Sequence, residues 1–261
     1  MKQENRYKVL IEKIFFDHYK SGMKEFEFDR TELETNATAL NIKLPKNLGD
    51  IIYSFRYRVA LPEKILKTQR AGRQWIIEGV GKARYRFRLA KENRIVPSEN
   101  RITIKIPDAT PELIASYAQN DEQALLAKVR YNRLVDIFLG LTTYSLQNHL
   151  RATVSTGAQM EIDELYVGLD KEGCHYVIPV QAKGGSDQVA VVQTQQDITW
   201  CTENYPGIKC RAISAMFMDD ERIAMFELTL QRNDILVVDE RHYQLVPADQ
   251  LDEKQLRNYR P

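Results

Sequence analysis

The sequence predicts an α/β protein made of two domains. Strand-like runs alternate with helical periodicity through its second half, which is the pattern of a mixed sheet flanked by helices. The 261 residues, 43% of them hydrophobic, can bury a core in two domains of ordinary size. The net charge of +1 hides a division, because residues 1–110 hold 23 Lys and Arg against 14 Asp and Glu, whereas residues 111–261 hold 14 against 22. We therefore predict a basic domain over residues 1–110 and an acidic domain over residues 111–261.

The division of charge has two interpretations. A basic domain joined to an acidic one is typical of a nucleic-acid reader attached to a unit that carries catalytic carboxylates. Opposite charges also arise when two domains dock on each other. On charge alone we favour the nucleic-acid reader.

The basic domain is predicted to be α+β. Apolar residues at helical spacing, with capping residues and Pro45 as punctuation, predict three helices, over residues 7–19, 32–40 and 48–58. After Pro62 the pattern becomes that of strands, over residues 74–77 and 82–89. Two short helices joined by a tight connection are compatible with a helix-turn-helix, so we expect a winged-helix-like domain that binds DNA.

The second strand-like run alternates cations with apolar residues. One face carries the cations Lys82, Arg84, Arg86 and Arg88. Residues on the same face of a strand lie about 6.5 to 7 Å apart, a spacing that can follow a phosphate backbone. No acidic residue interleaves the four cations, so we favour contact with nucleic acid over a strand that is merely kept soluble by charge.

The acidic domain is predicted to begin with helices and to continue as strands. The helices are expected over residues 122–138 and 142–151. Strands are expected over residues 160–169, 176–181, 210–218 and 223–228. A further helix over residues 189–203 separates the second of these strands from the third.

The first two of these strands place charged residues together. They are joined by the turn-like segment 170–173, which predicts a hairpin that brings Asp163 beside Gln181 and Lys183. Glu161 shares a strand face with Asp163. Oxygen ligands of this kind hold Mg²⁺, and a nearby Lys can orient or deprotonate an attacking water. The alternative is an exposed Asp–Lys pair, worth about 0 to 1 kcal/mol and without chemistry.

The same residues carry a family resemblance. Asp163, followed 18 positions later by Gln181-Ala182-Lys183, resembles the PD-(D/E)xK nuclease superfamily, whose core has an acid on one strand and (D/E)-x-K on the next. The resemblance covers roughly residues 120–230 and, with the basic domain, is similar to a type II restriction endonuclease. It implies a restriction-endonuclease-like mixed sheet, Mg²⁺-dependent hydrolysis of double-stranded DNA with Mn²⁺ able to substitute, and a homodimer that matches a palindromic target.

The resemblance also implies the roles of individual residues. The catalytic group would be Asp163, Gln181 and Lys183, and the metal ligands would be Asp163, Gln181, Glu161 and the Ala182 carbonyl. Gln181 departs from the family pattern because it stands where Asp or Glu is usual, so one negative charge is missing. This leaves open an active variant, a nuclease that recognises DNA structure instead of sequence, or a non-catalytic DNA-binding protein on a degenerate nuclease scaffold. We expect Gln193, on the next helix, to be solvated.

The remaining predictions concern partners and exclusions. Contact with DNA is predicted for Arg56, Arg58, Arg73, Lys82, Arg84, Arg86 and Arg88. The four His residues lack zinc-binding spacing, no G-x-S-x-G motif occurs, and no complete phosphate loop supports a nucleotide cofactor. No apolar run approaches the roughly 20 residues of a membrane span, and no signal-peptide pattern opens the chain, so we expect a cytoplasmic protein without a membrane partner.

Overall fold

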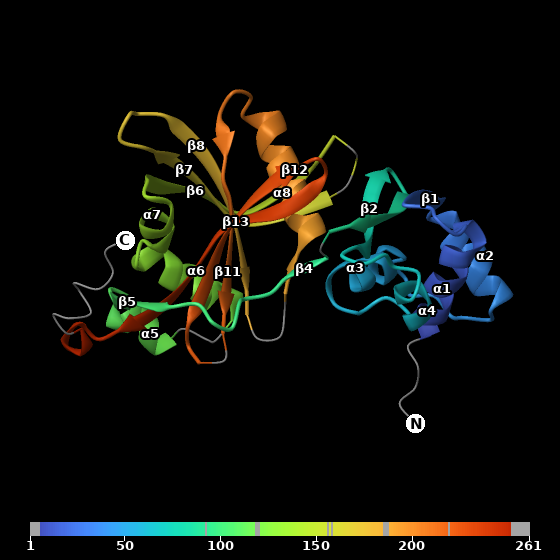
Figure 1. Cartoon of the computed structure of the whole chain (residues 1–261), viewed down its shortest axis with the longest axis horizontal. Helices are drawn as coiled ribbons and strands as arrows, with labels where there is room; N and C mark the ends of the chain where they lie inside the picture. The colour runs from blue at the N-terminus through green and yellow to red at the C-terminus, as the bar shows by residue number, and fades with distance from the viewer. Residues whose placement is uncertain are drawn as a thin grey trace.

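The computed structural model describes residues 6–91, 93–117, 121–155, 157, 159–184, 188–218 and 220–251. The predicted α/β class is confirmed, because a large mixed sheet is flanked by helices on both faces. A smaller body of helices and three strands lies at one side of this sheet (Figure 1). In the described ranges no helix is both long and apolar enough to cross a membrane.

The smaller body contains the three predicted helices. Its elements are α1 (Arg6–His18), β1 (Glu25–Asp29), α2 (Thr31–Ala39), α3 (Gly49–Tyr57), α4 (Glu63–Leu66), β2 (Gln74–Gly81) and β3 (Arg84–Ala90). The three strands are antiparallel in the order β1–β3–β2, so β3 lies in the centre.

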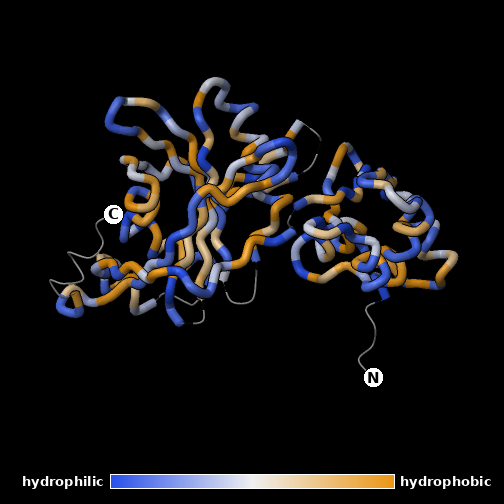
Figure 2. The backbone as a smooth tube through the Cα atoms, viewed as in Figure 1, coloured by the Kyte–Doolittle hydropathy of each residue, from blue (hydrophilic) through white to orange (hydrophobic). Residues whose placement is uncertain are grey.

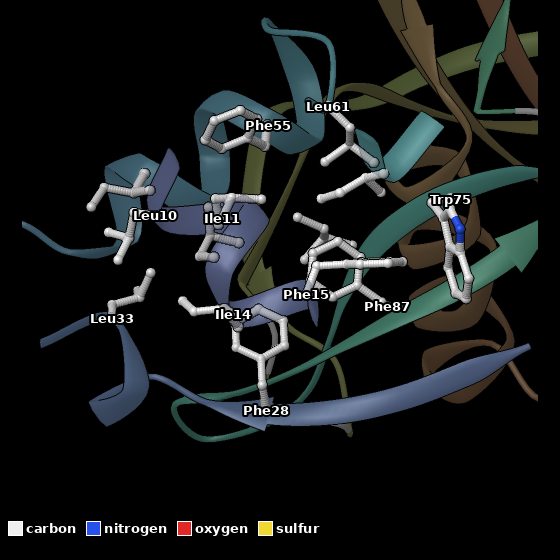
Figure 3. Close-up of a cluster of buried hydrophobic side chains, with 14 of the residues drawn as sticks. Leu10, Ile11, Ile14, Phe15, Phe28, Leu33, Phe55, Leu61, Trp75 and Phe87 are labelled. Atoms are coloured by element: carbon white, nitrogen blue, oxygen red, sulfur yellow. The ribbon is translucent and has the colours of Figure 1, made fainter. Parts of the chain in front are cut away.

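The core of this body forms where α1 packs on the small sheet (Figure 3). Apolar residues recur at helical spacing on α1, and Phe15 is fully buried with its ring centroid 5.2 Å from that of Trp75 and 5.1 Å from that of Phe87. Burying one such aromatic side chain contributes about 1.5 to 3 kcal/mol relative to leaving it exposed. The periodicity that predicted α1 is therefore the periodicity of its buried face.

The larger body is organised around one mixed sheet. Its strands lie in the order β5–β13–β12–β11–β8–β7–β6, with β10 also pairing with β8. Their bounds are β5 (Thr103–Pro107), β6 (Thr142–Thr153), β7 (Gln159–Leu169), β8 (His175–Lys183), β10 (Lys209–Cys210), β11 (Ala212–Phe217), β12 (Ile223–Gln231) and β13 (Asp234–Val246). Figure 2 shows apolar residues concentrated along the central strands.

Helices cover this sheet on both faces. On one face, α6 (Glu122–Tyr131) and α7 (Leu134–Leu139) pack against Ile178, Val180 and Ala182 of β8. On the other, α8 (Val191–Asn204) packs through Cys201 against Val177 of the same strand. Residues of β8 alternate between the two faces, so both faces of this strand are buried. The remaining elements are α5 (Glu112–Tyr117) and the 3-10 turn η1 (Ala248–Gln250).

Two predicted elements differ from the structure. The helix expected over residues 142–151 is wrong, because this segment is the edge strand β6, paired antiparallel with β7 from Thr142↔Leu169 to Thr153↔Gln159. Its opening residues Thr142, Thr143 and Tyr144 are of the types that favour strands. The helix expected over residues 122–138 is divided into α6 and α7 at Arg133, whose φ of 50° ends the first helix.

The domain boundary also lies earlier than residue 110. The two-residue strand β4 (Arg94–Ile95) pairs with β9 (Val189–Ala190), and β5 pairs with β13. Residues 94–107 therefore belong to the sheets of the larger body, and the boundary falls near Lys91.

The two bodies dock through the small sheet, α8 and the β12–β13 turn. Asp234, the first residue of β13 after that turn, accepts a hydrogen bond from the Arg73 guanidinium at 3.0 Å and lies 3.6 Å from the Arg88 guanidinium. Arg88 also donates to Gln195 of α8 at 3.3 Å, and Val192 of α8 joins a buried apolar cluster with the small sheet. Docking of oppositely charged domains, the second interpretation of the charge division, therefore accounts for part of it.

Candidate functional site

The candidate site lies where the β7–β8 hairpin opens. The hairpin predicted from the sequence is confirmed, and its ladder runs from Leu169↔His175 to Glu164↔Val180. Beyond that pair, the Asp163 carboxylate accepts a hydrogen bond from the Ala182 backbone N–H at 2.8 Å. A side chain therefore continues the contact between the two strands where their backbone ladder stops, and it fixes Asp163 beside the end of β8.

Lys183 ends β8 next to this carboxylate. Its ammonium donates to Glu122 Oε1 at 3.1 Å, and its side chain is only 14% exposed. Glu122 stands in the first turn of α6, which Asp121 caps by accepting a hydrogen bond from the Ala124 N–H. The Lys183 ammonium is therefore paired with Glu122, and its charge also acts on the Asp163 carboxylate.

Negative charge is concentrated around Asp163. Burial raises the pKa of the Asp163 carboxyl, the hydrogen bond from Ala182 and the Lys183 ammonium oppose the rise, and the charges of Glu122 and Glu161 add to it. A partly desolvated carboxylate with further acids nearby is stabilised by any cation that comes close. Asp163 and Glu122 thus supply carboxylate oxygens, the ligand type that Mg²⁺ prefers.

The Gln181 side chain is buried and hydrogen-bonded to protein groups, so it is not exposed as a metal ligand would be. It is 2% exposed, and its Nε2 donates to the Glu161 carbonyl at 2.7 Å and to Asp197 Oδ2 at 2.8 Å. Its Oε1 accepts from Gln193 Nε2 at 2.8 Å. Because Nε2 faces two acceptors, the orientation of the amide is determined by its partners. The expectation that Gln193 is solvated is wrong, because it contacts this amide from α8.

Glu161 reaches the site mainly through its backbone. Its carboxylate lies 3.2 Å from Arg151 Nε and 3.5 Å from His149 Nδ1, both on β6. Glu164, the other nearby acid, is fully buried on the opposite face, where it accepts from Arg130 at 2.8 Å. The carboxylate of the predicted ligand Glu161 is therefore already paired with the Arg151 guanidinium, whereas Ala182 contributes its backbone N–H to Asp163.

Glu122 is the site residue that the sequence analysis missed. It lies 61 positions before Lys183, and nothing in the spacing of the motif points to it. The only local signal is an acid in the first turn of the helix that precedes the strands. Across the described residues, no three His, Cys, Asp or Glu side chains are grouped so that they could hold a metal ion.

The prediction that β3 carries a row of unpaired cations is wrong for three of the four residues. The Arg84 guanidinium pairs with Glu27 of β1, and Arg86 and Arg88 lie 2.7 Å and 3.0 Å from Glu78 of β2. The acids come from the two neighbouring strands, so they do not interleave with the cations in the sequence. Three of the four cations are therefore paired with carboxylates of the same chain.

The other predicted DNA contacts divide into two groups. Arg73 is engaged by Asp234 at the domain interface, whereas Lys82 is exposed in the β2–β3 turn. Arg56 and Arg58 lie at the end of α3, each with its guanidinium carbon 5.2 Å from the centroid of a tyrosine ring. These two rings belong to Tyr57 and Tyr53, respectively.

The end of α3 carries a pair of neighbouring tyrosines. The rings of Tyr53 and Tyr57 are 4.7 Å apart between centroids, and Tyr53 is 49% exposed. Burial raises the pKa of the Tyr57 hydroxyl, and the Asp197 carboxylate is among the charges that act on it. Asp197 also accepts a hydrogen bond from Gln181, so the carboxylate that acts on the Tyr57 hydroxyl is the one that contacts the end of β8.

Comparison of the chain with family models, curated proteins and solved structures gives no match in any of the three.

Proposed function

We propose that the chain is a Mg²⁺-dependent endonuclease of double-stranded DNA, of the type II restriction class, with a restriction-endonuclease-like core. The observation that carries the proposal is the meeting of Asp163, Lys183 and Glu122 where the β7–β8 hairpin opens. An acid on one strand and a lysine at the end of the next are the parts that the PD-(D/E)xK resemblance requires. Glu122 supplies a second carboxylate that the sequence motif lacks.

The residues have distinct roles in this proposal. Asp163 and Glu122 would hold the metal ion, and Mg²⁺ supplies neutralisation of the phosphate charge when bound. Lys183, released from Glu122, donates a hydrogen bond to a phosphate oxygen or orients the attacking water. Asp163 keeps its orientation through the Ala182 N–H. Gln181 has a supporting role, because its hydrogen-bonding atoms are engaged by protein groups.

The smaller body would hold the DNA. Its order of helices and strands, with β3 between β1 and β2, supports a winged-helix-like reader in which α3 and the β2–β3 turn face the duplex. Of the predicted contacts we retain Arg58 and Lys82, which are exposed, for this role. Arg56 is not retained, because its Nε and Nη2 atoms are buried. Arg73, Arg84, Arg86 and Arg88 have carboxylate partners and would contribute little to DNA affinity.

A non-catalytic DNA-binding protein is the second candidate. The buried, fully hydrogen-bonded Gln181 favours it, because this position provides no negative charge for a metal. The two candidates share the DNA-binding surface and differ only in whether Asp163, Glu122 and Lys183 act on a phosphodiester.

Incubation with DNA separates the two candidates. Purified protein is mixed with methylated and unmethylated plasmid and genomic DNA in Mg²⁺ or Mn²⁺, and the products are resolved on a gel. We expect discrete fragments, no cleavage in EDTA, and, by gel filtration with light scattering, a dimer. Intact DNA under both metals, with salt-sensitive binding retained, would establish the non-catalytic candidate. A smear would replace sequence-specific cleavage with nonspecific hydrolysis.

A further inference from the structure

Asp197 is a buried acid next to the candidate site. It stands in the middle of α8, is 2% exposed, and accepts the Gln181 amide at Oδ2. Its Oδ1 has no hydrogen-bond partner within the described part of the chain. An isolated buried carboxyl is costly for a fold, so its placement one hydrogen bond from the site requires an explanation.

The acid and the amide stand in exchanged positions. The resemblance expects an acid at position 181 on β8, but the structure has an amide there and an acid directly opposite on α8. Burial raises the pKa of the Asp197 carboxyl well above its usual value, the charge of Asp163 adds to the rise, and the hydrogen bond from Gln181 and the charge of Lys183 oppose it. Asp197 therefore belongs to the same electrostatic cluster as the carboxylate proposed to bind metal.

We infer that Gln181 and Asp197 form an exchanged acid–amide pair, in which the helix supplies the acid missing from the strand. Asp197 is a positioning residue that acts through Gln181. Gln193 completes the arrangement by donating to Gln181 Oε1, so α8 holds both ends of the amide. The metal-dependent part of this inference rests on the proposed function.

The acid–amide pair predicts that an acid at position 181, which is usual in the family, lowers stability and cleavage in this protein. In Gln181→Glu, the new carboxylate would face the Glu161 carbonyl and Asp197 Oδ2, which are both acceptors and now lie 2.7 and 2.8 Å from Gln181 Nε2. Two hydrogen bonds would be lost and acceptors would oppose acceptors. We expect the melting temperature to fall by roughly 5 °C and cleavage to decrease instead of increasing.

The compensating substitution should recover part of the loss. In the double variant Gln181→Glu with Asp197→Asn, the amide introduced on α8 can donate to the carboxylate introduced on β8, while the Glu161 carbonyl stays without its donor. We expect the double variant to regain about half of the lost melting temperature, so the two substitutions are coupled instead of additive. Asp197→Asn alone keeps an acceptor for Gln181, so its melting temperature should be no lower than that of the wild type.

The experiment is a double-mutant cycle with two readouts. Melting temperatures of the four metal-free proteins give the coupling without reference to activity. The Mg²⁺ concentration for half-maximal plasmid cleavage should stay near the wild-type value in Asp197→Asn, because Gln181 keeps its acceptor, rise several-fold in Gln181→Glu, and return toward the wild-type value in the double variant. Gln159→Glu, an exposed Gln at the start of β7, is the matched control and should change neither readout.

Two outcomes would overturn the inference. Gln181→Glu that melts no lower than the wild type and cleaves at less Mg²⁺ would show that Gln181 is an ordinary ligand position. A double variant no more stable than the sum of its single changes would show that the two residues are not paired. If the wild type cleaves no DNA, the proposed function fails, yet the melting-temperature cycle still decides whether the pair exists.

Discussion

Two charged strands of this protein look alike in the sequence and behave differently in the fold. On β8, Lys183 was predicted to lie near Asp163, and the local hairpin brings both residues to one place. On β3, the cations were predicted to be open, but acids from β1 and β2 pair with three of them. The difference teaches that spacing identifies which strands pair but not every ion pair between them. Glu78 lies only 8 and 10 positions before Arg86 and Arg88, across the β2–β3 hairpin, whereas Glu27 lies 57 positions before Arg84.

The largest effect expected from this comparison is at Lys183. Lys183→Ala removes the only ammonium beside Asp163 and Glu122 within the described residues, so we expect plasmid cleavage to slow by about 10²- to 10⁴-fold with DNA binding retained. Initial rates and a gel-shift titration measure the two quantities. Lys171→Ala, in the exposed β7–β8 turn, is the control and should match the wild type. Equal rates for both variants would remove Lys183 from the chemistry.

The next effect is a difference in stability between substitutions of two β3 arginines, Arg88 and Arg84. Arg88 is 8% exposed between Glu78 and Asp234, so Arg88→Ala removes one buried charged partner from each carboxylate, while Arg86 and Arg73 stay paired with them. We expect it to cost about 1.5 to 3 kcal/mol of unfolding free energy. Arg84 is exposed, so Arg84→Ala should cost about 0 to 1 kcal/mol. Urea denaturation of both variants measures the difference. A similar cost for the two would contradict the contrast between buried and exposed pairs.

A smaller effect concerns DNA affinity. Arg58 lies over the exposed Tyr53 ring and, among the described residues, has no carboxylate partner of the kind found on β3, so Arg58→Ala should weaken DNA binding by about tenfold at moderate salt. The slope of log Kd against log salt should fall by about one. Arg84→Ala should leave both quantities unchanged. If Arg84→Ala weakens binding more than Arg58→Ala does, β3 and not α3 faces the duplex.

The smallest effect is a pH dependence at Asp163. Burial raises its pKa above that of the unfolded chain, so the folded protein binds this proton more tightly and loses stability as pH rises through the folded pKa. Asp163→Asn can still accept from Ala182 but cannot ionise. We expect it to melt about 2 °C above the metal-free wild type at pH 8, with a smaller difference at pH 4. The opposite trend with pH, measured by differential scanning fluorimetry, would reverse this assignment.

Local pattern predicted those parts of the fold whose partners are near in the chain. The amphipathic α1 and the β7–β8 hairpin followed from periodicity and a turn. The segment that forms β6 has an ambiguous pattern, with both faces largely exposed at the edge of the sheet, and only its pairing with β7 makes it a strand. The break at Arg133 depends on a left-handed residue that periodicity does not show.

For the candidate site, too, the sequence predicted the residues that lie near one another in the chain and missed those that come from distant helices. Asp163, Gln181 and Lys183 came from one hairpin, so spacing was sufficient to bring them together. Glu122 and Asp197 come from helices on opposite faces of the sheet, and their approach depends on how those helices pack. Long-range packing of this kind leaves no fixed spacing in a single sequence.

The position of α8 between the two bodies has a consequence for any attempt to divide the chain. Gln193 and Asp197 point from this helix to the hairpin, while Val192 and Gln195 are covered by the smaller body. A fragment that starts after Lys91 would leave an apolar contact and the Asp234 carboxylate facing solvent. The larger body expressed by itself should therefore be poorly soluble and defective at the hairpin, and mixing separately purified halves is an unsuitable way to assign their activities.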